Sequence, residues 1–222
     1  NTQRNLLLKT ALEQDKNISL SLNNQDSQNQ FIQTPLILVS ASGDKTVKLW
    51  HLKTGNCIRT LTGHQSRVRA ISFNSENLIL ASSSSDQTIR LWNLQTGKCF
   101  QVLEAHQQSV YAVTFNPKGT ILASGSADHK IILWKVFLTK PSQCLATLTT
   151  HQGGVSCLQF SPDGSLLYSG SYDQKIKVWD VTNLKNIVEK MTIKAHSNWL
   201  RSLTVSQDGT FLATGGDDQR VK

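Results

Sequence analysis

The sequence has little of what membrane-spanning or secreted proteins need. Only 17% of its 222 residues are charged and 38% are hydrophobic, and no apolar run approaches the ~20 residues that a transmembrane helix needs. The first residues contain no apolar core or small-residue cleavage site of a secretory signal. We therefore expect a globular, cytoplasmic protein without membrane contacts.

Cysteine is also scarce, with four residues and no CxxC pair. Cys57, Cys99 and Cys144 each precede a histidine by seven residues, so they represent one repeated position; Cys157 stands alone. This spacing does not suit zinc. We expect four free thiols packed as small hydrophobic side chains, and neither disulfides, nor a metal site, nor a cofactor.

Basic residues outnumber acidic ones and give a net charge of +8, but they are scattered. Lys48, Arg90 and Lys177 each stand two residues before a tryptophan, which places them on the same strand face as that tryptophan. We expect their stems to lie on apolar neighbours while their charges reach water. A nucleic-acid site needs a clustered basic stripe, so the distribution argues against nucleic acid as a partner.

A repeated unit dominates the chain. Trp50, Trp92, Trp134 and Trp179 lie 42, 42 and 45 residues apart, each with an aspartate six residues before it. A fifth copy begins at Thr214, and the chain stops two residues before the expected tryptophan. A fixed period of this length predicts stacked structural units, and we expect the chain to be part of a longer protein.

Each unit contains four short strand patterns. The first begins four residues after a histidine, the second ends in small hydroxyl residues, the third alternates into the tryptophan, and the fourth is brief. Examples are residues 68–73, 78–82, 88–92 and 57–61. Turns such as Ser161-Pro162-Asp163-Gly164 suit tight hairpins between the first two strands. The pattern predicts an all-β fold of four-stranded antiparallel blades, a β-propeller.

The N-terminal segment, residues 1–34, lacks this regularity. Residues 4–14 are compatible with a short helix, and residues 23–33 have the polar, amide-rich composition of a linker or long loop. We expect residues 1–34 to be partly helical or a degenerate first blade. We expect residues 35–222 to form the propeller repeats.

These units resemble WD40 repeats. The matching pieces are Gly63-His64, Ala105-His106, Thr150-His151 and Ala195-His196 near the start of a unit, and Trp92-Asn93, Trp134-Lys135 and Trp179-Asp180 near its end. The resemblance covers about residues 35–222. It implies a propeller of about four complete blades and a partial fifth, whereas seven blades are most common in the family. A small ring and an open arc remain alternatives, but unpaired edge strands are prone to aggregation, so we favour an excerpt of a larger propeller. The Thr-Gly-Asn-Cys and Thr-Gly-Lys-Cys junctions at 54–57 and 96–99 are similar to those of bacterial members.

The resemblance also implies a structural hydrogen-bond network in each blade. Its members here are Trp92, Ser82, His64 and Asp86; Trp134, Ser124, His106 and Asp128; and Trp179, Ser169, His151 and Asp173. The fifth unit offers Thr214, His196 and Asp218. The first offers Ser40, Asp44 and Trp50, but Leu22 occupies its histidine position.

Serine, histidine and aspartate also make a hydrolase triad. Here the trio recurs in successive units without a Gly-x-Ser-x-Gly elbow, whereas a nucleophile is expected once. We therefore expect no catalytic residue and no enzyme activity.

Partner contacts, by the same resemblance, come from two recurring positions around the central channel. One is the third residue after each histidine (Arg67, Ser109, Gly154, Trp199), and the other precedes the turn aspartate (Gly43, Ser85, Ala127, Tyr172, Asp217). Arg67, Tyr172 and Trp199 are the main candidate anchors, because aromatic and arginine side chains supply most interface hot spots. Ser85, Ser109 and Asp217 are further candidates, and Arg69, Tyr111 and Arg201 are weaker neighbours.

Two functions remain open at this point. The leading one is a non-catalytic scaffold that binds a protein or peptide on the channel face. The alternative is the sensing or regulatory module of a multidomain signalling protein, whose kinase, peptidase or nucleotide-binding domain lies outside this chain. In either case other blades of the same parent protein are expected neighbours.

Overall fold

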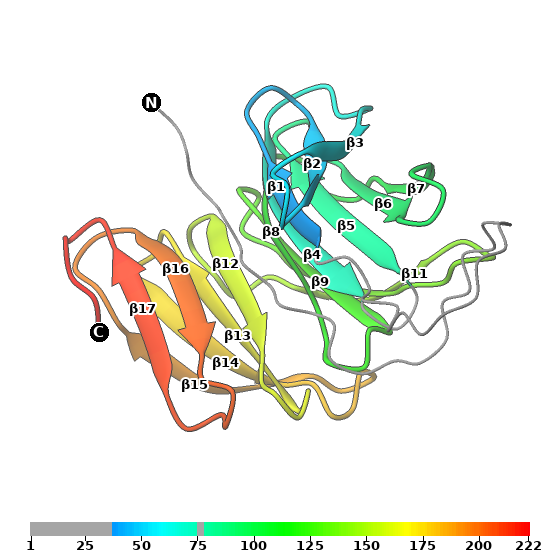
Figure 1. Cartoon of the computed structure of the whole chain (residues 1–222). Helices are drawn as coiled ribbons and strands as arrows, with labels where there is room; N and C mark the ends of the chain where they lie inside the picture. The colour runs from blue at the N-terminus through cyan, green and yellow to red at the C-terminus, as the bar shows by residue number, and fades with distance from the viewer. Residues whose placement is uncertain (1–36, 75–77) are drawn as a thin grey trace, which may run out of the picture.

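The computed structural model describes residues 37–74 and 78–222, and all of their regular structure is β-strand. The predicted helix at 4–14, the predicted linker at 23–33 and Leu22 lie outside these residues. Within the described residues, seventeen strands form five antiparallel sheets that stand side by side (Figure 1). The all-β propeller arrangement expected from the repeats is confirmed.

Three sheets are complete four-stranded meanders. The second blade contains β4 (Val68–Asn74), β5 (Ile79–Ser84), β6 (Ile89–Asn93) and β7 (Cys99–Leu103). The third contains β8 (Val110–Phe115), β9 (Ile121–Ser126), β10 (Ile131–Lys135) and β11 (Gln143–Leu148). The fourth contains β12 (Val155–Phe160), β13 (Leu166–Ser171), β14 (Lys175–Asp180) and β15 (Val188–Lys194).

The outer two sheets are smaller within the described residues. The first blade contains β1 (Ile37–Ala41), β2 (Val47–His51) and β3 (Cys57–Leu61). The fifth contains β16 (Leu200–Val205) and β17 (Leu212–Gly216), with one further bridge between Gly215 and Val221. The described part of the chain therefore holds three complete blades between two partial ones.

The innermost strands β4, β8, β12 and β16 pack against one another in this order and line the concave side of the arc (Figure 1). Apolar side chains between neighbouring blades form the core. Val110, Leu122 and Leu133 are fully buried at such contacts. Each blade thus buries its faces only against its neighbours, as repeat architectures do.

The second strand β5 extends two residues beyond the predicted 78–82, to Ser84, and β9 and β13 end at the equivalent Ser126 and Ser171. Close packing between blades explains the difference. A Cβ added at Gly125 would lie 2.6 Å from Val155 Cγ1 of the next blade. The small residues therefore stay in the sheet, because the following inner strand packs directly on them.

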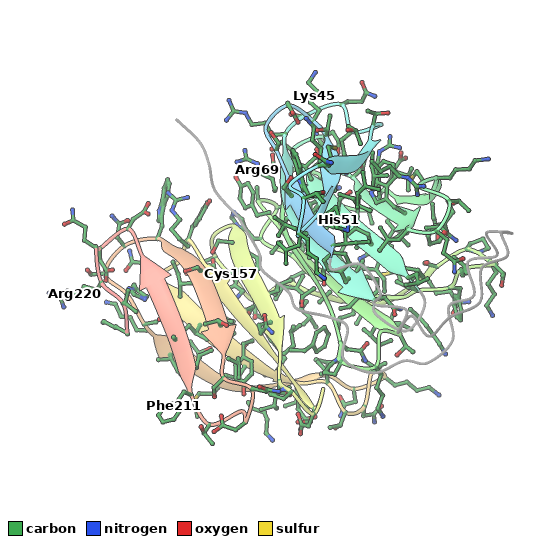
Figure 2. All side chains as sticks on the ribbon, in the orientation of Figure 1. Lys45, His51, Arg69, Cys157, Phe211 and Arg220 are labelled. Carbon is green, nitrogen blue, oxygen red and sulfur yellow. The ribbon has the colours of Figure 1, made fainter. Side chains whose placement is uncertain are left out.

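Chain direction alternates along each meander, so the loops fall on two opposite faces. Loops that enter the first strand and turns between the second and third strands share one face, which we call the channel face. Turns between the first and second strands and junctions between the third and fourth lie on the other, which we call the opposite face. Phe211, in a turn of the opposite face, and Arg69, near the channel face, lie toward opposite ends of the view in Figure 2.

Candidate functional site

The second blade contains a continuous chain of hydrogen bonds. Trp92 Nε1 donates to Ser82 Oγ at 2.8 Å, Ser82 Oγ lies 2.8 Å from His64 Nε2, and His64 Nδ1 lies 2.8 Å from Asp86 Oδ2. Every group has a partner if the neutral imidazole carries its proton on Nδ1. Ser82 and His64 are buried, so this arrangement satisfies polar groups that would otherwise destabilise the core.

The same chain recurs in the next blades. In the third, Trp134 donates to Ser124 at 3.0 Å, and His106 lies 2.9 Å from both Ser124 and Asp128. In the fourth, Trp179 donates to Ser169 at 2.9 Å, and His151 lies 2.8 Å from both Ser169 and Asp173. In the fifth, His196 lies 2.9 Å from Thr214 and 2.8 Å from Asp218.

The first blade holds a shorter version. Trp50 donates to Ser40 at 2.8 Å, and among the residues that the structure describes Asp44 Oδ1 accepts local bonds, from the backbone N–H and the hydroxyl of Thr46. In the complete blades each aspartate serves both purposes. Asp86, for example, holds its own turn through Thr88 and binds His64. The aspartate therefore ties the turn of the channel face to the interior of the blade.

Burial sets the protonation of these groups. It lowers the pKa of His64 and of His106, and the bonds to Asp86 and Asp128 offset this only in part. Burial also pushes the pKa of Asp86 upward, but hydrogen bonds from Thr88, Gln65 and His64 outweigh it and bring the value to about 2. Both histidines are therefore neutral at pH 7 and face carboxylates that are ionised.

The serine hydroxyls in these chains are buried and already hydrogen-bonded. Ser82, Ser124 and Ser169 have no exposed surface, and each accepts a bond from an indole N–H while contacting an imidazole. A substrate cannot reach the oxygen without opening the blade. The arrangement acts as a support for the blade.

The expectation that the basic residue two positions before each tryptophan reaches water is wrong for Lys177. Its side chain is 9% exposed, and its Nζ bonds Glu189 at 2.7 Å and Thr192 at 2.9 Å. The outer strand β15 supplies both partners and covers the lysine. Lys48 instead lies partly exposed over the ring of Trp50.

The cysteines are all free thiols, but they do not all pack as small hydrophobic residues. Cys57 and Cys144 are exposed and Cys99 is partly exposed, because their position falls at the start of the outermost strand. Cys157 lies on the inner strand β12, near the middle of the arc (Figure 2). The expectation of packed thiols was therefore wrong for Cys57 and Cys144.

The two sequence positions selected on the channel face are hydrogen-bonded to each other in every blade where both are described. The backbone N–H of the residue before the turn aspartate donates to the carbonyl of the third residue after the histidine. The pairs are Ser85 with Arg67, Ala127 with Ser109, Tyr172 with Gly154, and Asp217 with Trp199, at 2.8–2.9 Å. The side chains at these two positions therefore lie next to each other on the channel face.

Aromatic rings from three successive blades form a continuous row on this face. Tyr111 and Tyr172 have ring centroids 5.5 Å apart, and Trp199 stacks on Tyr172 at 4.7 Å with an interplanar angle of 19°. Gly154 permits the approach, since a Cβ there would lie 3.2 Å from Tyr111 and 3.4 Å from Tyr172. Trp199 remains 47% exposed.

Two arginines extend this row. The guanidinium of Arg69 lies 5.6 Å from the centroid of Tyr111, and that of Arg201 lies 5.0 Å from Tyr172 and 5.1 Å from Trp199. Both separations fall within the range of cation–π contacts. We call Arg69, Tyr111, Tyr172, Arg201 and Trp199 together the aromatic row.

Polar contacts hold the arginines in place. Arg69 Nε donates to Ser85 Oγ at 2.6 Å. Arg201 donates to both carboxylate oxygens of Asp217, at 2.8 and 2.5 Å, and to the Tyr172 hydroxyl at 2.9 Å. The bonds to Asp217 raise the pKa of Arg201. Ser85 and Asp217 thus position the row.

The remaining main candidates lie beside the row. Arg67 is exposed, and its stem borders Gly43 of the preceding blade, 3.8 Å from where a Cβ would stand. Ser109 is partly exposed at the entry to β8. Sequence reasoning ranked Arg69, Tyr111 and Arg201 below these residues, although the structure places all three in the row.

Each of these three residues occupies a β-bulge. The register against the second strand shifts between Val68 and Ala70, between Val110 and Ala112, and between Leu200 and Ser202. A bulge changes the direction of the side chain at that position. All three residues stand five positions after the histidine of their repeat, and this spacing is the sequence signal that could have identified them.

The described residues contain neither a metal-binding cluster nor a membrane-spanning helix. Across 37–74 and 78–222, no group of three or more His, Cys, Asp or Glu side chains is arranged to hold a metal ion. Within the same residues, no helix has the length and apolarity required to cross a membrane.

A family model described as "WD domain, G-beta repeat" matches five segments of this chain: 14–51, 55–93, 97–135, 142–180 and 188–222. The chain belongs to the WD40-repeat family. The first match starts at residue 14, inside the segment expected to precede the regular repeats. A 39-residue stretch, 18% of the chain, is 54% identical to the nuclear distribution protein PAC1 of Coprinopsis cinerea, and it corresponds to 9% of that protein.

Removing the serine hydroxyl at the centre of the polar chain should lower the free energy of unfolding more in a complete WD40 blade than in the first blade. Ser82→Ala leaves the indole N–H of Trp92 and the Nε2 of His64 without partners in a buried site, so we expect a loss of about 1–3 kcal/mol in the free energy of unfolding. Ser40→Ala removes one bond from Trp50, which is partly exposed, and water can replace it. Urea denaturation measures both; equal losses would contradict a role for the full chain.

Stability should fall with pH in two stages. Unfolded histidines take up a proton near their usual pKa of 6.5, whereas folded His64 and His106 resist it, so the unfolded state binds more protons and stability decreases below about pH 6.5. Asp86 and Asp173, with pKa values of about 2 against a usual 3.8, add a second loss below about pH 4.

The measurement is the melting temperature at pH 7.5, 5.5 and 4. The control variant, His51→Gln with His129→Gln, removes the two histidines outside these chains and should show the same fall. A melting temperature that is constant from pH 7.5 to 5.5 would contradict the assignment.

Proposed function

We propose that this chain is a non-catalytic scaffold that binds a protein or peptide segment on its channel face. The WD40 family is generally one of protein-interaction scaffolds. The observation that carries the proposal here is the aromatic row, in which Trp199 stacks on Tyr172 and still exposes nearly half of its surface. Exposed, immobilised tryptophan, tyrosine and arginine are the side chains that dominate binding energy at interfaces.

Preorganisation supports the same proposal. Arg201 contacts two rings and donates to Asp217 and Tyr172, so its long side chain is already ordered. Binding then costs less side-chain entropy than it would with a free arginine. A rigid aromatic surface with a fixed cation suits a peptide that presents a flat apolar or aromatic side chain.

The charge of the row favours protein over nucleic acid. Arg201, the arginine nearest to Trp199, is paired with the carboxylate of Asp217, and Arg69 bonds Ser85. Nucleic-acid sites gather unneutralised cations along the phosphate backbone. We propose a protein partner for this reason.

The relative adds no specific partner. Its name concerns nuclear distribution, and the shared stretch is about one repeat long. We also propose that the protein acts in the cytoplasm, because all four cysteines are free and reduced thiols are the rule in that compartment.

The test is affinity purification with this chain as bait, comparing the wild type with Trp199→Ala plus Arg67→Ala. Both residues are exposed, so the melting temperature should stay within about 2 °C. We expect partners that bind the wild type to be captured at least ~10-fold less by the variant. The matched control is Phe211→Ala, an aromatic residue 75% exposed on the opposite face.

Partners that bind the double variant as well as the wild type would contradict the proposal. Loss of the same partners with Phe211→Ala would do so as well, since it would move the interface away from the channel face. A partner confirmed in this way should then be titrated against both variants as purified proteins.

A further inference from the structure

A recess lies on the opposite face, between the third and fourth blades. It has a volume of about 870 Å³, within the range of roughly 300–1,000 Å³ found for ligand pockets. Its walls come from the β8–β9 and β12–β13 turns, the outer strand β11, and the junction from β14 to β15. We call it the inter-blade groove.

Longer junctions distinguish the two blades that enclose this groove. Each repeated tryptophan has a partner at the start of the fourth strand: Cys57 for Trp50, Cys99 for Trp92, Cys144 for Trp134 and Glu189 for Trp179. Each tryptophan is therefore separated from its partner by 7, 7, 10 and 10 positions along the chain, in the order of the blades. Among the four blades whose junctions the structure describes, the third and fourth carry three extra residues, and loop insertions on a regular scaffold are common sites of function.

Apolar side chains line the groove. Leu145, Ala146 and Leu148 come from β11, and Leu184 and Ile187 come from the longer junction of the fourth blade. All five pack against the core between these blades and remain only partly buried. The groove therefore offers apolar surface that the described residues do not cover.

Lysines surround this apolar surface. Lys118, Lys135 and Lys185 line the groove and are exposed, and no ion pair joins any of them to a carboxylate within 37–74 and 78–222. Lys135 lies 5.6 Å from the ring of Phe137, which leaves its charge in place. Asp163 is the acidic residue of the lining, and Ser161 and Ser165 already bond its oxygens.

We propose that the inter-blade groove is a second docking site, and that it binds a peptide segment of a partner protein carrying both apolar side chains and carboxylates. The apolar residues would cover the leucines of the groove, and the carboxylates would pair with Lys118, Lys135 and Lys185. Three cations against one anion favour this charge. The site lies on the face opposite the aromatic row, so the protein can hold two partners at once.

The test is selection of a displayed library of random 12-residue peptides on the immobilised 222-residue chain. Selected peptides are then synthesised and titrated against three variants by fluorescence anisotropy. The groove variant is Lys118→Glu with Lys135→Glu. The matched control is Lys98→Glu with Lys45→Glu, two exposed lysines away from the groove, and the third variant is Trp199→Ala on the channel face.

We expect a class of peptides rich in Asp, Glu and apolar residues that binds the groove variant at least ~10-fold more weakly. Its affinity for the control and for Trp199→Ala should stay within about twofold. Because all the substituted lysines are exposed, the lysine variants should have the same melting temperature as the wild type. Filling the groove by Ala146→Leu should weaken the same peptides.

The proposal fails if no selected peptide depends on Lys118 and Lys135. It also fails if every such peptide is equally weakened by the control pair, which would indicate general attraction to a basic protein. If all selected peptides depend on Trp199 instead, the channel face binds and the groove does not. The two proposals therefore fail independently.

Discussion

The hydrogen-bond chain from indole to carboxylate is the interaction on which the rest of the structure depends. It joins the third strand, the second strand, the loop before the first strand and the turn aspartate within one blade. The histidine and aspartate at its far end belong to the loops of the channel face. A chain buried for the stability of the blade thereby fixes the channel-face loops that carry Tyr172 and Trp199. Blade stability and the binding surface therefore depend on the same channel-face loops in successive units.

The repeated framework makes the exceptions informative. Where the repeat is regular, a residue contributes to packing or to the polar chain, and its equivalents in other blades do the same. Tyr111, Tyr172 and Trp199 are aromatic in three successive blades, at positions where other blades carry arginine, serine, glycine, alanine or aspartate. The longer third–fourth junctions occur in two adjacent blades. Both exceptions fall where neighbouring blades meet, so each creates a surface that one blade could not form.

Period and strand pattern predicted the blades and their order, because both express the same local geometry, and the resemblance to WD40 repeats implied the members of the polar chains. It did not predict that Arg69, Tyr111 and Arg201 are as central to the channel face as Trp199. Those three lie at bulges, and a register shift between strands leaves no composition signal. Burial of Lys177 depended on Glu189, a partner from the following strand. The inter-blade groove arises from packing between blades and could not be read from one repeat.

Hydrogen exchange of the five indole N–H groups, followed by NMR, tests the central claim most directly. If the chains form as described, Trp92, Trp134 and Trp179 exchange slowly, because their N–H groups are buried and bonded to serine. Trp50 exchanges faster, and Trp199, which is exposed on the channel face, exchanges fastest. Exchange of the three blade tryptophans at the rate of Trp199 would contradict the account, since the polar chains would then not be holding the blades closed.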